Sequence, residues 1–177
     1  MIRERKGLLF DFTAPPADAT WVSTDDVVMG GVSSSTIRIH DEGIAVFEGV
    51  LSLQHGGGFA SVHCQLSPAD LSGYDGLEMR VRGDGKRYRV RLRISVAPAV
   101  IYQAAFTTRD GVWESVRLPF ESFEPTYRGQ AVPDAPPLDV THIGSFGWLI
   151  ADRQAGQFRL EIDWVRAYVE EPSDVDH

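Results

Sequence analysis

Hydrophobic and polar residues alternate with a period of two along much of the chain. The clearest run is residues 86–96, where Tyr88, Val90, Leu92 and Ile94 fall on one face and four arginines fall on the other. Because successive side chains of a strand point to opposite faces, this segment predicts a strand with one buried and one solvated face.

The same alternation predicts further strands along the chain. They cover residues 7–12, 35–40, 43–53, 59–66, 76–81, 101–108, 112–118, 143–151 and 157–164. Glycine-containing turn signals separate many of them, at 41–43, 56–58, 83–85 and 110–111. Many short strands without a convincing amphipathic helix predict an all-β fold, a two-sheet antiparallel β-sandwich of the jelly-roll kind.

The chain has 177 residues, which suits one domain, and we expect that domain over residues 7–169. Residues 124–139 include four prolines and are expected to form a long, functional loop. Residues 170–177 are expected to be a disordered acidic tail, with its negative charges at Glu170, Glu171, Asp174 and Asp176.

Charge and composition narrow the possible partners. The net charge of -8 argues against nucleic acid, because neutralising phosphates requires an excess of Lys and Arg. The start of the chain has no apolar stretch typical of a signal peptide or a membrane span. We therefore expect a cytoplasmic, bacterial protein without membrane insertion. The single cysteine, Cys64, allows no internal disulfide and is expected to be a small buried hydrophobe.

Metal and cofactor chemistry is not indicated. The five histidines lack zinc-ligand spacing, no cysteine cluster accompanies them, and no G-x-S-x-G nucleophile elbow occurs. The Gly83-Asp84-Gly85 segment joins two strands and opens no helix, so it is not a phosphate loop. We expect no cofactor and no metal, apart from a weak calcium possibility at Asp25 and Asp26.

The segment 21–33 is the first candidate binding site. Its relevant residues are Trp21, Asp25, Asp26, Met29, Gly30, Gly31 and Ser33. The acidic pair followed by adjacent glycines fits a turn pinned by carboxylate-to-backbone hydrogen bonds. The alternative is a binding loop, and the sequence leaves the two interpretations open.

Arginines and aromatic residues supply two further candidates. If the strands around 80 and 90 pair as a hairpin, Arg80, Arg82, Arg89, Arg91 and Arg93 line one basic face that can recognise carboxylates or phosphates. The alternative is a solvated face balanced by Glu78 and Glu114. The aromatic candidates, Trp21, Tyr102, Tyr127 (next to Arg128) and Trp148, either anchor a ligand or belong to the core.

Several segments together resemble the complex I intermediate-associated protein 30 family. The first is the run from Trp21 to Ser33, with its Asp25-Asp26 pair and Met29-Gly30-Gly31. The others are 58–62, 70–77, 82–85, 113–120, 123–129, 143–144 and 151–162, so that the resemblance covers about residues 8–169. It implies a galactose-binding-domain-like jelly roll. The mitochondrial member of the family is an assembly chaperone for respiratory complex I, and the second half of the chain also resembles certain carbohydrate-binding modules.

Three functional hypotheses follow. The first is a non-catalytic protein-binding domain, assembly-factor or chaperone-like, whose partner is a subunit or intermediate of a membrane-associated complex. The second is a carbohydrate-binding module, which requires at least two coplanar exposed aromatic rings. The third is a hydrolytic enzyme that uses Asp25 or Asp26, which requires a carboxylate with a raised pKa inside a pocket.

Overall fold

A computed structural model describes residues 8–11, 21–25, 34–39, 43–53, 58–127 and 130–170. Within these ranges the chain is built almost wholly from strands, as the alternation predicts. The strands are β1 (Leu8–Asp11), β2 (Trp21–Asp25), β3 (Ser34–Ile39), β4 (Ala45–Leu51), β5 (Ala60–Ala69), β6 (Gly76–Arg82), β7 (Arg87–Ile94), β8 (Ala97–Thr107), β9 (Trp113–Pro119), β10 (Glu124–Tyr127), β11 (Gln130–Ala131), β12 (Ile143–Ile150) and β13 (Gly156–Tyr168). Two short 3₁₀ turns, Phe120–Ser122 and Val140–His142, precede β10 and β12.

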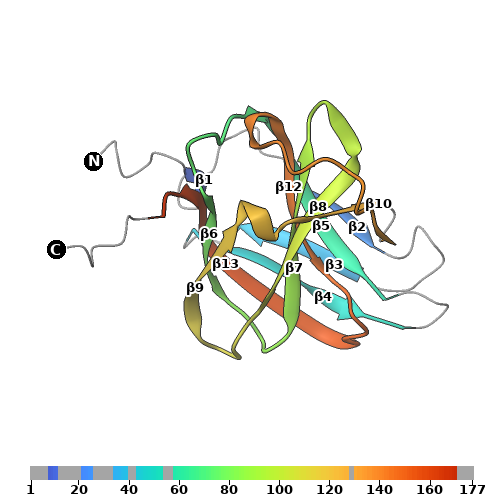
Figure 1. Ribbon diagram of the computed structural model, residues 1–177. Helices are drawn as coiled ribbons and strands as arrows, with labels where there is room; N and C mark the ends of the chain where they lie inside the picture. The colour runs from blue at the N-terminus through green and yellow to red at the C-terminus, as the bar shows by residue number, and fades with distance from the viewer. Residues whose placement is uncertain are drawn as a thin grey trace.

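The described strands form two antiparallel sheets that face each other (Figure 1). The six-stranded sheet has the order β3-β4-β13-β6-β9, with β1 also paired to β13. The seven-stranded sheet has the order β11-β10-β8-β7-β12-β5-β2. This arrangement confirms the predicted two-sheet antiparallel sandwich.

The core lies between the two sheets, where the apolar residues of each alternating strand meet. In β7 the inward residues Tyr88, Val90, Leu92 and Ile94 are at most 5% exposed. On the facing sheet Phe47 and Phe158 pack edge-on against each other and against Tyr88. Cys64 is also buried, as expected. Strand alternation therefore fixes which side chains are left for the two outer faces.

The Gly83-Asp84-Gly85 turn carries the chain from one sheet to the other. The Asp84 carboxylate accepts hydrogen bonds from the Tyr88 hydroxyl (3.0 Å), from the Lys86 amide (3.1 Å) and from the Arg159 amide of β13 (2.8 Å). At Gly83 a Cβ would lie 2.3 Å from the side chain of Thr108, so only glycine fits there. The turn is a structural joint between the sheets, in agreement with the prediction that it is no phosphate loop.

The predicted loop at 124–139 contains two strands that the sequence did not indicate. β10 pairs with the middle of β8, and β11 pairs with β10 at the sheet edge. The Tyr102 hydroxyl donates a 2.7 Å hydrogen bond to the Pro136 carbonyl, which attaches the segment after β11 to β8. Proline misled the prediction because Pro125 is tolerated in a short strand near the sheet edge.

We expect Asp84→Ala to lower the free energy of unfolding by about 1–3 kcal/mol, because it leaves the buried Tyr88 hydroxyl without its acceptor. Tyr88→Phe should cost about 1 kcal/mol, since it removes the hydroxyl together with its need for a partner. Urea unfolding of both single variants and of the double variant measures the coupling between the two residues. If the two effects simply add, the hydrogen bond does not hold the joint.

Candidate functional site

The predicted arginine face is divided between two surfaces, so the prediction of one continuous face was wrong. Arg80 and Arg82 lie on β6 in the six-stranded sheet, whereas Arg89, Arg91 and Arg93 lie on β7 in the seven-stranded sheet. The reason is the Gly83–Gly85 joint, which crosses between the sheets instead of closing a hairpin. The two groups of arginines therefore face solvent on opposite sides of the sandwich.

The arginines of the six-stranded sheet are matched with carboxylates. Glu78 accepts hydrogen bonds from Arg117 (3.2 Å) and Arg166 (2.7 Å), and Glu161 pairs with Arg82. Burial raises the pKa of Glu78, but the hydrogen bonds from Arg166 and Arg117 outweigh it, so that the pKa is lowered overall. This face therefore agrees with the alternative interpretation, in which carboxylates balance the arginines. Glu78, however, pairs with Arg117 and Arg166, which do not belong to the predicted arginine face.

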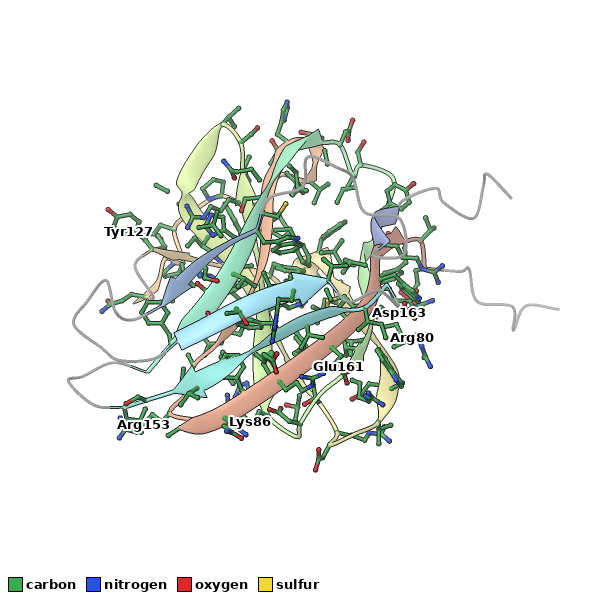
Figure 2. All side chains as sticks on the ribbon, turned by 180° about the vertical axis from the view of Figure 1, so that it is seen from behind. Arg80, Lys86, Tyr127, Arg153, Glu161 and Asp163 are labelled. Atoms are coloured by element: carbon green, nitrogen blue, oxygen red, sulfur yellow. The ribbon has the colours of Figure 1, made fainter. Side chains whose placement is uncertain are left out.

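Arg80 completes the matched face through an aromatic contact. Its guanidinium lies 5.8 Å from the ring centre of Trp113, and that of Arg82 lies 5.2 Å from the same ring. Figure 2 shows Arg80 and Glu161 on this side of the molecule, with Tyr127 at the opposite margin of the view. Trp113 is thus engaged by cations of its own face.

The outer face of the seven-stranded sheet is different in kind. Across its centre, Gln103 of β8, Arg91 of β7, Gly147 of β12 and His63 of β5 form one transverse row of paired residues. A Cβ at Gly147 would lie 2.2 Å from the Val62 carbonyl oxygen, so the position requires glycine. Because Gly147 has no side chain, nothing from β12 separates Arg91 from His63 in this row.

Arg91 is a desolvated cation. Its Nε atom is buried and has no hydrogen-bond partner, and none of the ion pairs formed by the described residues includes Arg91. Burial and, to a smaller extent, the charges of Arg93 and Arg89 together lower the pKa of Arg91 to about 10. Arg89 is neutralised by Asp152, but Arg93 has no ion-pair partner in the described part of the chain.

His63 lies beside these arginines on the neighbouring strands. Burial lowers the pKa of its imidazole from the usual 6.5, and the charges of Arg93 and Arg91 lower it further. The imidazole is therefore neutral near pH 7 and can accept or donate one hydrogen bond at each ring nitrogen.

A small hollow opens next to Arg93, where β12 has a bulge between Ile143 and Ser145. Its volume is about 220 Å³, and Gln65, Arg93, Gly144 and Ser145 are among the residues that line it. Bulges interrupt the ladder and often lie beside functional sites. We call His63, Arg91 and Arg93, with the neighbouring Gln65, Gln103 and Ser145, the arginine site.

A larger open hollow, of about 540 Å³, lies on the six-stranded sheet. Both signs of charge line it, and they are already paired: Glu48 bonds Arg38 and Arg159, and Lys86 lies 3.7 Å from Asp84. It offers a ligand no charge that lacks a partner, so the arginine site is the better candidate.

The aromatic candidates lie mostly in the core. Trp148 is fully buried and Tyr102 is 1% exposed, because both occupy inward positions of their strands. Trp21 is half-buried and stacks on Trp148 with 5.5 Å between ring centres. Tyr127, at the end of β10, is 44% exposed and is the most exposed of the four.

The acidic segment is described only in part. The backbone of Asp25 ends β2, which pairs with β5, so the segment begins as a strand. Asp26, Met29, Gly30, Gly31 and Ser33, like Arg128 of the second loop, lie outside the described residues. Over the ranges that the structure describes, no three His, Cys, Asp or Glu side chains gather where they could hold a metal ion.

Sequence reasoning missed His63, Gln65, Gln103 and Ser145. Each occupies an outward position of an alternating strand, and that much was readable from the sequence. Their assembly depends on strand order, since His63 and Gly147 meet only because β5 and β12 are neighbours.

The described ranges also contain no helix with the length and apolar character needed to span a bilayer.

We expect the free energy of unfolding to fall between about pH 7.5 and about pH 5.5, partly through His63. With a folded-state pKa below 6.5, the unfolded chain binds the proton first, so stability is lost as the pH falls through 6.5. His63→Gln should remove this part of the pH dependence, measured by urea unfolding at both pH values. His142→Gln, on an exposed histidine outside the site, is the control; equal pH dependence in wild type and His63→Gln would contradict the assignment.

Comparison with known proteins identifies the family. A model of the complex I intermediate-associated protein 30 family matches residues 10–162. The mitochondrial complex I intermediate-associated protein 30 of Drosophila melanogaster is 27% identical over 89% of this chain, and that of Mus musculus is 26% identical over 96%. The matches cover 61% and 58% of those proteins, so the chain spans less than two thirds of their length.

Solved structures agree on the fold. A family 11 carbohydrate-binding module from Clostridium thermocellum, in complex with a mixed-linked tetrasaccharide, superposes with a TM-score of 0.68 over 94% of this chain and 97% of its own, at 18% identity. An agarase superposes with a TM-score of 0.64 over 94% of this chain and 25% of its own, at 12% identity. These likenesses support the galactose-binding-like sandwich, and the match over residues 10–162 shows that the chain belongs to the complex I intermediate-associated protein 30 family.

Proposed function

We propose that this chain is a non-catalytic, cytoplasmic protein-binding domain that acts in the assembly of a membrane-associated respiratory complex. Family membership supports the proposal, because its curated relatives carry the name complex I intermediate-associated protein 30. The observation that carries it is the arginine site: a desolvated cation on an outer sheet face, with no carboxylate partner among the described residues.

The geometry of this face suits a protein partner. Its central strands β5, β12, β7 and β8 present a broad surface made of backbone and short or flexible polar side chains, with Arg91 at its middle. Protein interfaces favour arginine near the centre, where it is desolvated and meets groups of the partner. A catalytic pair would need a nucleophile hydrogen-bonded to its base, and among the described residues no hydrogen bond joins the Ser145 hydroxyl in the hollow to the His63 imidazole.

A carbohydrate ligand is less well supported, despite the likeness to carbohydrate-binding modules. Identities of 18% and below show the fold alone. The outward positions of β5, β12, β7 and β8 carry no Trp, Tyr or Phe, and of the four aromatic candidates only Tyr127 is largely exposed. The coplanar pair of exposed rings that sugar stacking requires is absent from the described central strands.

The test is affinity capture of the tagged chain from a membrane-solubilised lysate of its own host, quantified by mass spectrometry against the tag alone. We expect enrichment of respiratory complex I subunits, and a lower level of the assembled complex in native gels when the gene is deleted. A glycan array run with the same preparation should give no saturable signal. A saturable glycan signal together with no enrichment of complex I subunits would refute the proposal.

A further inference from the structure

We propose that Arg91, Arg93 and His63 form a binding site for a carboxylate presented by an acidic segment of the partner protein. This inference rests on the proposed function and names the chemical group that the face recognises. It is carried by the geometry of the transverse row, the buried Nε of Arg91 and the hollow beside Arg93.

The first step is the missing partner of Arg91. A guanidinium carries five N–H donors in a planar fork, and burying one without an acceptor costs the full desolvation of that group. On the opposite sheet every comparable cation pairs with a carboxylate or an aromatic ring, as Arg82 does with Glu161. Arg91 lacks such a group within the described residues, and an incoming carboxylate supplies the two oxygens that fit the fork.

The second step is that Arg91 does not stand alone. Arg93 is two residues along the same strand and on the same face, in the row with Ser145 and Gln65. Like charges at this spacing repel each other, which lowers the pKa of Arg91. An anion between them is attracted to both cations, and the two attractions offset the repulsion between the arginines.

The third step concerns size. The hollow of about 220 Å³ beside Arg93 is smaller than the roughly 300–1,000 Å³ of sites that take drug-sized ligands. It suits a single side chain and not an oligosaccharide. Its lining by Gln65, Ser145 and Arg93 provides donors for the end of an Asp or Glu side chain.

The fourth step favours a short acidic segment over a polyanion. The chain carries a net charge of -8, so its overall field repels nucleic acid and other dense phosphate polymers. Arg91 and Arg93, without ion-pair partners among the described residues, make the local field at the arginine site positive. One or two carboxylates on a protein surface match two cations without bringing a large negative charge against the rest of the molecule.

The pKa of His63 should report whether a carboxylate is bound at the site. The charged groups that face it are Arg91 and Arg93 of β7; β12 presents Gly147 and Ser145 to it, and β2 presents Val22. A bound carboxylate offsets the two arginine charges and therefore raises the pKa of the imidazole. Binding should thus be accompanied by proton uptake near His63 and be tighter at mildly acidic pH.

We expect an NMR titration of the labelled full chain with a capped tetraglutamate peptide to shift the Arg91 Nε–Hε and His63 ring signals, while a tetraglutamine peptide leaves them unchanged. The double variant R91Q/R93Q should bind the glutamate peptide roughly tenfold or more weakly, because the fork and the charge are both lost. Arg91→Lys keeps the positive charge but loses the planar fork of donors, so its affinity for the glutamate peptide should lie between those of wild type and R91Q/R93Q. Arg109→Gln, an exposed arginine elsewhere, is the matched control and should bind as wild type does.

Several outcomes would overturn the inference. One is equal affinity of wild type and R91Q/R93Q for the glutamate peptide, with unchanged amide spectra showing that both are folded. A second is the absence of any Arg91 or His63 shift at millimolar peptide. A third is tighter, arginine-dependent binding of inorganic phosphate than of the peptide, which would make the site a phosphate site.

The same variants separate this inference from the proposed function. If wild type and R91Q/R93Q capture complex I subunits equally, the protein-binding role stands and the carboxylate site is refuted. If wild type captures none, the proposed function fails whatever the peptide titration shows. Loss of capture in R91Q/R93Q but not in Arg109→Gln supports both.

Discussion

The Asp84 carboxylate holds the point at which the chain leaves one sheet and enters the other, and the charge pattern of both faces depends on it. Its hydrogen bonds to Tyr88 and to the Arg159 amide connect β7 with β13 across the sandwich. Because the joint crosses between layers, β6 and β7 are consecutive in sequence but lie in different sheets. A hairpin at the same place would have put all five predicted arginines on one surface, within reach of the same glutamates.

The crossing leaves the two faces with different electrostatics. On the six-stranded sheet, Glu78 and Glu161 are buried, but each carboxylate is compensated by ion pairs and hydrogen bonds with arginines at the surface. On the seven-stranded sheet, Arg91 is more deeply buried, and no carboxylate of the described residues pairs with it. The two faces therefore differ in the cost of burying charge, since a desolvated charge without a partner destabilises the fold more than a buried charge that is paired and hydrogen-bonded. A site that binds an anion gains affinity from this imbalance, because the bound state removes a penalty that the free state carries.

Much of the fold could be predicted from the sequence, and much of the site could not. Alternation identified the core residues of β7 and the outward position of its arginines, because both follow from local strand geometry. Strand order is not local: His63 and Gly147 are far apart in the chain, and only the pairing of β5 with β12 brings them together. The assumption of a hairpin at 83–85 failed for the same reason, because the same Gly-Asp-Gly sequence can connect two strands of one sheet or two strands of different sheets. The aromatic candidates Trp148 and Tyr102 were ambiguous because the face they occupy depends on which sheet they join.

The position of Gly147 explains how closely β12 and β5 approach each other beside Arg91. Any larger residue there would press its Cβ against the Val62 carbonyl and force β12 away from β5. Glycine lets β5 approach β12 so closely that the Val62 carbonyl and the His63 Cβ take the space of a side chain at 147, and Arg91 and His63 occupy paired positions on either side of β12. Replacing Arg91 by an apolar residue of similar size would relieve the burial of charge, and such replacements often stabilise a protein. An arginine at the centre of the sheet with no carboxylate partner among the described residues lowers stability, and in the proposed site it discriminates against partners that cannot supply a carboxylate at that point.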